Sequence, residues 1–300
     1  MTDSETDVSV IGCGNMGSAF ICTLADAGRE VTIWNRTRAK AEALAGPQVT
    51  VADSVEHALE ASPTTLVSVT NYEATREVLD DHLERLAGRT LVQLSSGKPD
   101  AARSLDTSVT RADGDYVDGV VFSYPSAVGT DDLLIIYSGD PEAFEATRPL
   151  LEQLGGTAMH VGDDPGAACV YDFATVPPAM IMAIGIWQGA KICEVEGVSL
   201  EIFEELTEGL IPVIAKDSLR KAADPDFATD PEKAESTVRA AVEEAETLAE
   251  YFHEVGIDTG IVSAVHRLLQ AGVENGRGEH DIACVAELHA DHPEPIPQTN

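Results

Sequence analysis

The stretch VSVIGCGNMGSAF, residues 8–20, decides the fold of the first half of this chain. An apolar, β-branched run leads into Gly12, Gly14 and Gly17, and a helical pattern follows. In a G-x-G-x-x-G pattern placed between strand and helix, the first glycine permits a tight turn and the second admits a pyrophosphate close to the backbone. The third lets helix and strand pack closely, and the helix N-terminus offers unpaired N–H donors to the anion. We therefore expect a dinucleotide site here, lined by Gly12, Gly14, Asn15, Met16 and Gly17.

The next predicted strand ends just before Asn35, Arg36 and Thr37, about 20 residues after the glycines. NAD-binding domains place an Asp or Glu there for the ribose 2′-hydroxyl, and this chain has no acid at that point. Instead, hydrogen-bond donors and the cations Arg36, Arg38 and Lys40 stand where NADP carries its extra phosphate. The alternative is a solvated helix start. We expect the cofactor to be NADPH or NADP⁺, held by Asn35, Arg36, Thr37 and Lys40.

The first half of the chain alternates short β-rich runs with helical patterns, which is typical of a parallel sheet covered by helices. Predicted strands lie at residues 7–11, 30–34, 65–69, 90–94, 116–122 and 133–138. Helical patterns lie at residues 15–27, 38–45, 54–61 and 71–86. After about Gly162 the strand-like runs end, and the remainder is predicted to be helical. The predicted class is α/β: an N-terminal Rossmann domain with a doubly wound sheet, a long interdomain helix and an all-α C-terminal domain.

We expect the NADP-binding Rossmann domain over residues 1–163, a helical domain over residues 164–289, and a disordered Pro-rich tail over residues 290–300. The helical domain begins with one long element, Ala167–Glu196, whose middle, AMIMAIGIW, is apolar on every side. Such a helix must be buried all round, and a half-sized helical domain cannot cover it alone. The sequence therefore predicts a homodimer that forms through the helical domain.

The charge of the chain is strongly one-sided, with 52 Asp and Glu against 19 Lys and Arg and a net charge of −33. A surface of this sign repels polyanions, so nucleic acid is not expected as a partner. The acidic residues are spread along the chain, as on proteins from salt-loving cells, where molar salt shortens the Debye length to about 3 Å. We expect this protein to need high salt for stability.

The remaining composition excludes several classes of protein. The polar, acidic start does not resemble a signal peptide, and no uninterrupted apolar run approaches the roughly 20 residues that cross a bilayer. The five cysteines and eight histidines show no ligand or disulfide spacing, so no metal is expected. We therefore expect a cytoplasmic protein without a membrane partner.

Several segments together resemble one known family. VSVIGCGNMGSAF and GREVTIWNRTRAKAEAL resemble the cofactor half of the β-hydroxyacid dehydrogenase (6-phosphogluconate dehydrogenase-like) superfamily and, within it, the imine reductases. TNYEAT, LVQLSSG, YVDGVVFSYPSAVGT and LLIIYSG match further imine reductase segments in order, and the resemblance spans residues 7–285. It implies NADPH-dependent reduction of a small-molecule substrate, a cyclic imine or iminium ion, to an amine.

The resemblance also assigns a catalytic position within GDDPGAACVYDFATV. Hydroxyacid dehydrogenases carry a lysine at the start of the interdomain helix, whereas imine reductases have another residue, commonly Asp or Tyr. The match of Gly162, Asp164, Gly166 and Ala168 places Asp172 there. A carboxylate favours an iminium cation that a lysine would repel, and a partly buried carboxyl with a raised pKa donates a proton. The sequence leaves both roles open, together with a plain helix-start hydrogen bond.

Four further residues are candidates for the site. Ser96, in LSSG, resembles the residue that borders the nicotinamide in this superfamily, and an ordinary serine turn is the alternative. Tyr124, Tyr171 and Trp187 are candidates for the substrate pocket, and aromatic residues at such places are alternatively plain core.

Pro177 and Pro178 depart from the family, which keeps this helix continuous. A proline inside a helix removes a hydrogen bond and clashes with the preceding turn, at a cost of about 3 kcal/mol or more. The sequence therefore predicts a break or kink near Val176 that reshapes the pocket.

The sequence leaves two other functions open. One is an NADP-dependent β-hydroxyacid-type carbonyl oxidoreductase that has lost its lysine. The other is a non-catalytic NADPH-binding protein, which would bind cofactor without turning over any imine or ketone.

Overall fold

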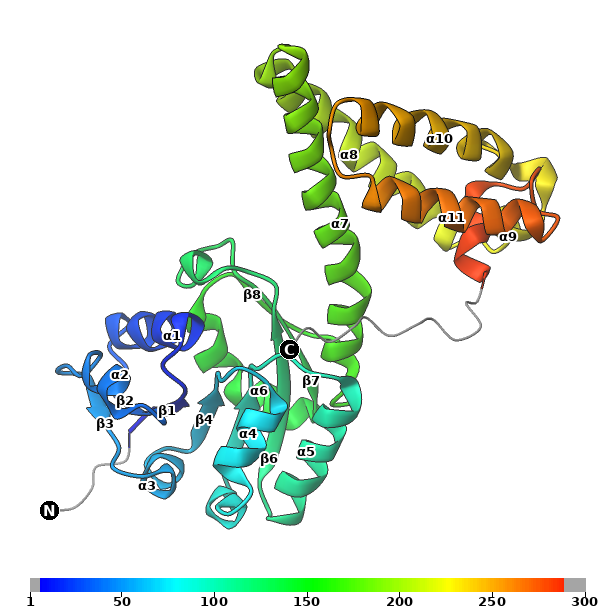
Figure 1. Cartoon of the computed structure of the whole chain (residues 1–300). Helices are drawn as coiled ribbons and strands as arrows, with labels where there is room; N and C mark the ends of the chain where they lie inside the picture. Colours follow the sequence, from blue (N-terminus) through cyan, green and yellow to red (C-terminus); the bar gives the residue numbers. More distant parts are fainter. Residues whose placement is uncertain (1–5, 289–300) are drawn as a thin grey trace, which may run out of the picture. The chain divides into compact units, whose positions relative to one another are not determined.

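The computed structural model of the chain describes residues 6–288 (Figure 1). The chain divides into two compact units, Met1–Val176 and Pro177–Asn300, and helix α7 (Ala167–Glu196) contributes to both. The domain boundary expected after residue 163 stays a prediction. The tail expected to be disordered, residues 290–300, lies outside the described residues.

The first unit is built on one sheet, whose described strands follow the order β3-β2-β1-β4-β5-β6-β7-β8. The strands are β1 (Val8–Ile11), β2 (Val31–Trp34), β3 (Val49–Val51), β4 (Thr64–Val67), β5 (Thr90–Gln93), β6 (Asp115–Val121), β7 (Leu134–Gly139) and β8 (Thr157–His160). The first six run parallel, whereas β7 pairs antiparallel with β6 and parallel with β8. The strand order reverses between β1 and β4, and this switch point is where doubly wound sheets bind ligands.

Helices cover both faces of this sheet. The first unit contains α1 (Asn15–Asp26), α2 (Arg38–Glu42), α3 (Val55–Glu60), α4 (Tyr72–Leu79), α5 (Pro99–Arg111), α6 (Pro141–Leu151) and the start of α7. Val8 and Val10 of β1 pack in one apolar cluster with Phe20 of α1, whereas Ile11 packs in a second cluster with Leu105 of α5. Because successive strand residues face opposite sides, a strand covered on both faces is buried throughout, as β1 is, and this confirms the predicted Rossmann sheet.

The predicted elements of this half are found with small shifts at their ends. Two strands were not predicted, namely β3, which has three residues, and β8, which mixes small and polar residues. The helical pattern at residues 71–86 divides into α4 and a 3₁₀ turn at Leu83–Leu86. The reversed direction of β7 was also not predicted, because hydrophobic pattern alone does not state strand direction.

The second unit consists of helices, as predicted. Besides the rest of α7 it contains α8 (Leu200–Ala222), α9 (Asp226–Thr229), α10 (Val238–Glu254), α11 (Gly260–Glu274) and the 3₁₀ helices Pro231–Lys233 and Ile282–Glu287. Val242 of α10 and Leu269 of α11 share a small core with Cys284. Lys221 at the end of α8 forms a buried ion pair with Asp281, at 2.9 Å, that joins α8 to the last 3₁₀ helix.

Helix α7 differs from two expectations. It stays helical through Pro177 and Pro178, so a break near Val176 is wrong, whereas a kink there stays a prediction. The prolines deprive the carbonyls of Phe173 and Ala174 of their helical partners, and both of these residues are exposed, so solvent can satisfy those groups. The helix has 30 residues and a window of mean hydropathy 1.5, so by length and composition alone it is apolar enough to span a membrane. The length of its uninterrupted apolar runs does not reveal this property, because polar residues interrupt the apolar segment.

Candidate functional site

The glycine-rich turn between β1 and α1 is closely packed on one side and open on the other. Gly12 has a φ of +107°, and a Cβ added to it would lie 2.1 Å from the Ser68 carbonyl oxygen. A Cβ at Gly17 would lie 2.0 Å from the Gly12 carbonyl oxygen, so neither position accepts a side chain. A Cβ at Gly14 would meet no heavy atom of the described chain within 4 Å. Gly12 and Gly17 therefore close the turn, while Gly14 leaves its outer side free for a ligand.

The N-terminus of α1 faces this free side without an internal partner. Within residues 6–288 no side chain caps the helix, and its first turn contains no acidic residue. Its leading N–H groups and the positive end of the helix dipole are thus available to an anion. These features fit the pyrophosphate of a dinucleotide.

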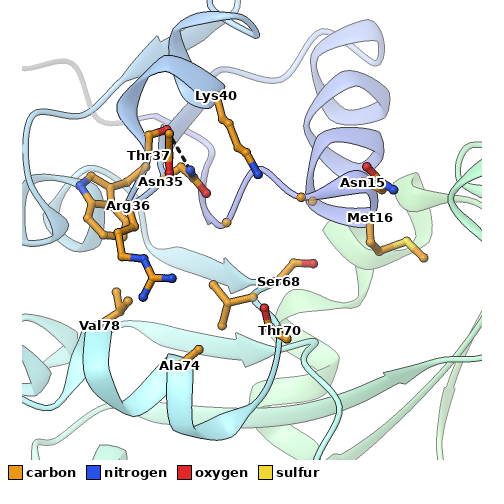
Figure 2. Close-up of a pocket in the computed structure, with 15 residues that line it drawn as sticks. Asn15, Met16, Asn35, Arg36, Thr37, Lys40, Ser68, Thr70, Ala74 and Val78 are labelled. Atoms are coloured by element: carbon orange, nitrogen blue, oxygen red, sulfur yellow. Dashed lines mark hydrogen bonds between the residues drawn. The ribbon is translucent and has the colours of Figure 1, made fainter. Parts of the chain in front are cut away.

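A cavity of about 340 Å³ opens at this turn (Figure 2). Nine of the ten candidate cofactor residues line it, and Ser96 does not. The complete lining is Gly12, Gly14, Asn15, Met16, Gly17, Trp34, Asn35, Arg36, Thr37, Lys40, Ser68, Val69, Thr70, Ala74 and Val78. The cavity thus lies at the carboxyl ends of β1, β2 and β4, at the switch point of the sheet.

Only two of the three clustered cations line this cavity. Arg38 bonds Glu42 at 2.8 Å and Asp53 at 3.0 Å, and it is not part of the lining. Lys40 lines the cavity and forms no ion pair within the described chain, and Figure 2 shows its side chain extending from α2 toward the glycine turn. The guanidinium of Arg36 lies 3.6 Å from the carboxylate of Glu77, in a solvent-exposed pair. Arg36 and Lys40 are therefore the cations available to a phosphate.

Asn35 connects the two loops that form the cavity. Its Oδ1 accepts a hydrogen bond from the backbone N–H of Cys13 at 3.0 Å. Its Nδ2 donates to the Thr37 carbonyl at 2.9 Å, as the dashed line in Figure 2 shows. The thiol of Cys13 points into the core, where burial raises its pKa to about 11. Asn35 thus holds the glycine turn against the β2–α2 loop, in addition to lining the cavity.

A second cavity, of about 200 Å³, adjoins the first and contains Ser96. Met16, Ser68, Val69 and Thr70 line both cavities. The last three follow β4 directly and were not among the predicted site residues. The signal that could have found them is their position, because the loop after β4 faces the glycine turn across the switch point.

Asp172 lies in the second turn of α7, separate from both cavity linings. Its side chain is half-buried, and burial raises the pKa of its carboxyl above the usual value. No lysine occurs in α7 before Lys191. The first two turns of the helix therefore present an acid that holds its proton more readily than an exposed carboxyl.

The three aromatic candidates do not line these cavities. Tyr124 follows β6 and is 85% exposed, and Tyr171 is 49% exposed beside Asp172. Trp187 belongs to the second unit and is 68% exposed. The alternative considered for them, plain core within the chain, does not match these exposures.

Comparison with known families matches both parts of the chain. Residues 7–162 match the NAD binding domain of 6-phosphogluconate dehydrogenase. Residues 164–291 match the C-terminal domain of the NADPH-dependent reductive aminase-like family. An NADPH-dependent reductive aminase from Aspergillus oryzae is 24% identical over 291 residues, which cover 93% of this chain and 96% of that protein.

Solved structures agree over nearly the full length. An imine reductase from Myxococcus stipitatus in complex with NADP⁺ is 32% identical, with a TM-score of 0.85 over 94% of this chain and 99% of that one. A reductive aminase from Aspergillus terreus, in complex with NADPH, cyclohexanone and allyl amine, is 25% identical, with a TM-score of 0.85 over 95% of this chain and 99% of that one.

Proposed function

The chain belongs to the imine reductases of the 6-phosphogluconate dehydrogenase-like superfamily, and we propose that it uses NADPH to reduce cyclic imines or iminium ions to amines. The observation that carries this proposal is the chemistry at the start of α7, where the half-buried Asp172 stands in a segment without lysine. A lysine there suits the alkoxide that forms when a carbonyl is reduced, whereas an acid suits a protonated nitrogen. This contrast favours C=N substrates over oxo acids.

The residues around the first cavity fit NADPH. The free N–H groups of α1 and the open side of Gly14 suit the pyrophosphate, while Arg36, Thr37 and Lys40 suit the 2′-phosphate. Ser96 lines the adjoining cavity, which supports the proposal that it borders the nicotinamide. Bound NADPH supplies the hydride that reduces the substrate carbon.

Asp172 has two roles that depend on the substrate. With a neutral imine, the carboxyl group donates its proton to the nitrogen as the carbon receives hydride, and solvent then returns a proton to the carboxylate. With an iminium ion no proton is needed, and the carboxylate stabilises the cation. The raised pKa of Asp172 supports the first role, because more of the protonated form is then present near neutral pH.

We further propose that two copies of the chain pair through the helical unit. Apolar side chains of α7 and α8 lie exposed in the single chain, and they include Met180, Ile181, Met182, Ile184, Leu206, Leu210, Val213 and Ile214. An apolar surface of this extent on a soluble fold marks an interface. On α8 it alternates with Glu204, Glu205 and Glu208, and such charges suit a protein partner better than lipid.

We assign the protein to the cytoplasm, as a soluble enzyme. All five cysteines are free thiols within the described residues, and three of them are buried. This state fits a reducing compartment.

The decisive experiment follows NADPH oxidation by the purified protein with a cyclic imine, and NADP⁺ reduction with a β-hydroxyacid in parallel. The proposal expects turnover of the imine and none of the hydroxyacid. Turnover with oxo acids or hydroxyacids alone would favour the carbonyl oxidoreductase. Tight NADPH binding with no turnover of any imine or ketone, unchanged in Asp172→Ala, would favour the non-catalytic protein.

Light scattering after size-exclusion chromatography tests the dimer. We expect twice the chain mass of 31.8 kDa for the native protein, and loss of this species in Ile181→Glu. Met159→Glu is the matched control, because Met159 is a comparably exposed apolar residue on β8 of the first unit. A monomer mass for the native protein would contradict the proposal.

A further inference from the structure

Buried polar side chains cross the sheet where it meets the first turn of α7. Gln93 of β5, Asp118 of β6 and Ser138 of β7 are register partners in adjacent strands, and all three are fully buried. Burying polar groups costs free energy unless each is hydrogen bonded, and well-packed apolar residues are often at least as stable. These three side chains, the polar row, therefore cost stability compared with apolar residues. The groups to which they are hydrogen bonded indicate what role offsets this cost.

Ser138 binds the start of α7 on two sides. Its Oγ accepts a hydrogen bond from the backbone N–H of Ala168 at 3.0 Å and donates to the carbonyl of Pro165 at 2.9 Å. One buried hydroxyl thus fixes both the loop that enters the helix and the first helical turn.

Asp118 binds the same turn from the neighbouring strand. Its Oδ2 accepts a hydrogen bond from the Cys169 thiol at 3.3 Å, while its Oδ1 accepts one from the Tyr116 hydroxyl at 2.8 Å and another from the Tyr72 hydroxyl. The carboxyl therefore joins α4, β6 and α7 at one point. Burial raises its pKa to about 7, against the lowering effect of the three donors.

We propose that Asp118 and Ser138 are positioning residues for the reaction: they hold the first turn of α7 and so fix the backbone that presents Asp172. This inference rests on the function proposed for Asp172. Asp172 follows Ala168 by four residues and Cys169 by three, so it lies on the helix side that the two anchors hold. A misplacement of about 1 Å at a reacting group costs about 100-fold in rate.

Gln93 provides a matched control within the same polar row. Its Nε2 donates to Thr75 Oγ1 of α4 at 2.9 Å, and it has no hydrogen bond to α7 among the described residues. Replacement of Gln93 by leucine thus removes a buried polar group of the same row and leaves the hydrogen bonds to the helix start in place.

The test compares Ser138→Ala and Asp118→Ala with Asp118→Asn and Gln93→Leu in the full-length enzyme. For the two alanine variants we expect kcat for a cyclic imine to fall about 10- to 100-fold, with the Kd of NADPH changed less than about twofold. Asp118→Asn should recover most of the rate. The amide oxygen of the asparagine still accepts hydrogen bonds from the Tyr72 and Tyr116 hydroxyls, and the amide nitrogen donates one to the sulfur of Cys169. Gln93→Leu should keep the native kcat.

Amide hydrogen exchange over residues 165–176 supplies a readout that needs no activity. We expect exchange there to accelerate in Ser138→Ala and Asp118→Ala and to stay native in Gln93→Leu. If the native protein reduces no imine, the proposed function fails, and this exchange measurement judges the anchoring alone. Native exchange and native kcat in Ser138→Ala would overturn the inference, as would an equal loss of kcat in Gln93→Leu. If Asp118→Ala does not fold, Ser138→Ala and Asp118→Asn decide the outcome.

Discussion

Replacing Lys40 by glutamine should separate the two nicotinamide cofactors. Lys40 lines the cofactor cavity and has no internal ion pair within the described chain, so its charge is available to the 2′-phosphate. A cation and a phosphate dianion about 4 Å apart attract by about 2 kcal/mol in water. Physiological salt, with a Debye length of about 8 Å, reduces this to about 1.3 kcal/mol, which is roughly a tenfold change in Kd. NADH has no phosphate there, so its Kd should change less than about twofold.

The assay is a fluorescence titration of each purified variant with NADPH and with NADH. Arg38→Gln is the matched control, because it also removes one positive charge. Arg38 lies two residues before Lys40, but its side chain is bound to Glu42 and Asp53. This substitution should change neither Kd by more than about twofold. Asn35→Ala should weaken both cofactors alike, because Asn35 holds the shape of the site through Cys13 and Thr37. Equal losses of NADPH and NADH in Lys40→Gln would refute the assignment of the phosphate site.

Glu77→Gln should tighten NADPH by about 0.5 kcal/mol, roughly twofold, because it frees Arg36 and removes a like charge near the phosphate, and the same titration measures it. Asp172→Asn should lower kcat for a neutral imine by about 100- to 10,000-fold and leave the Kd of NADPH native, and steady-state kinetics with a native rate would contradict its role as proton donor. The pKa of Asp118 is about 7 in the folded protein, above its ordinary value of 3.8. The stability tied to its proton is therefore complete below about pH 4 and is lost as pH rises from there to about 7, at about 1.4 kcal/mol per unit. Melting temperatures should therefore fall less between about pH 5 and about pH 8 in Asp118→Asn than in the native protein, and parallel curves would argue against this titration. Salt screens the repulsion that follows from the net charge of −33, so the melting temperature should rise from low to molar KCl. Melting curves that do not change with salt would contradict this prediction.

Local patterns in the sequence were sufficient for the first unit's main elements and for most of the candidate cofactor site. The three glycines require a tight, closely packed turn, and that turn alone brings Asn15 and Met16 to the cavity. The absence of an acidic residue directly after β2 is likewise a property of the sequence alone. The break expected near Val176 was wrong, because a rule about helix interiors takes no account of exposed carbonyls that solvent can reach.

Other features were decided only by the tertiary structure. Arg38 and Lys40 are equivalent cations in the sequence, and the fold turns one toward Asp53 and the other toward the cavity. Asp118 and Cys169 are 51 residues apart, so their contact depends on the strand register and on where α7 crosses the sheet. The physical reason is the range over which the determinants act. Backbone sterics and hydrophobic periodicity depend on a few consecutive residues, so they can be recognised in a short stretch of sequence. Side-chain pairing across strands and helices depends on the closure of the whole sheet, which no single stretch of the chain encodes.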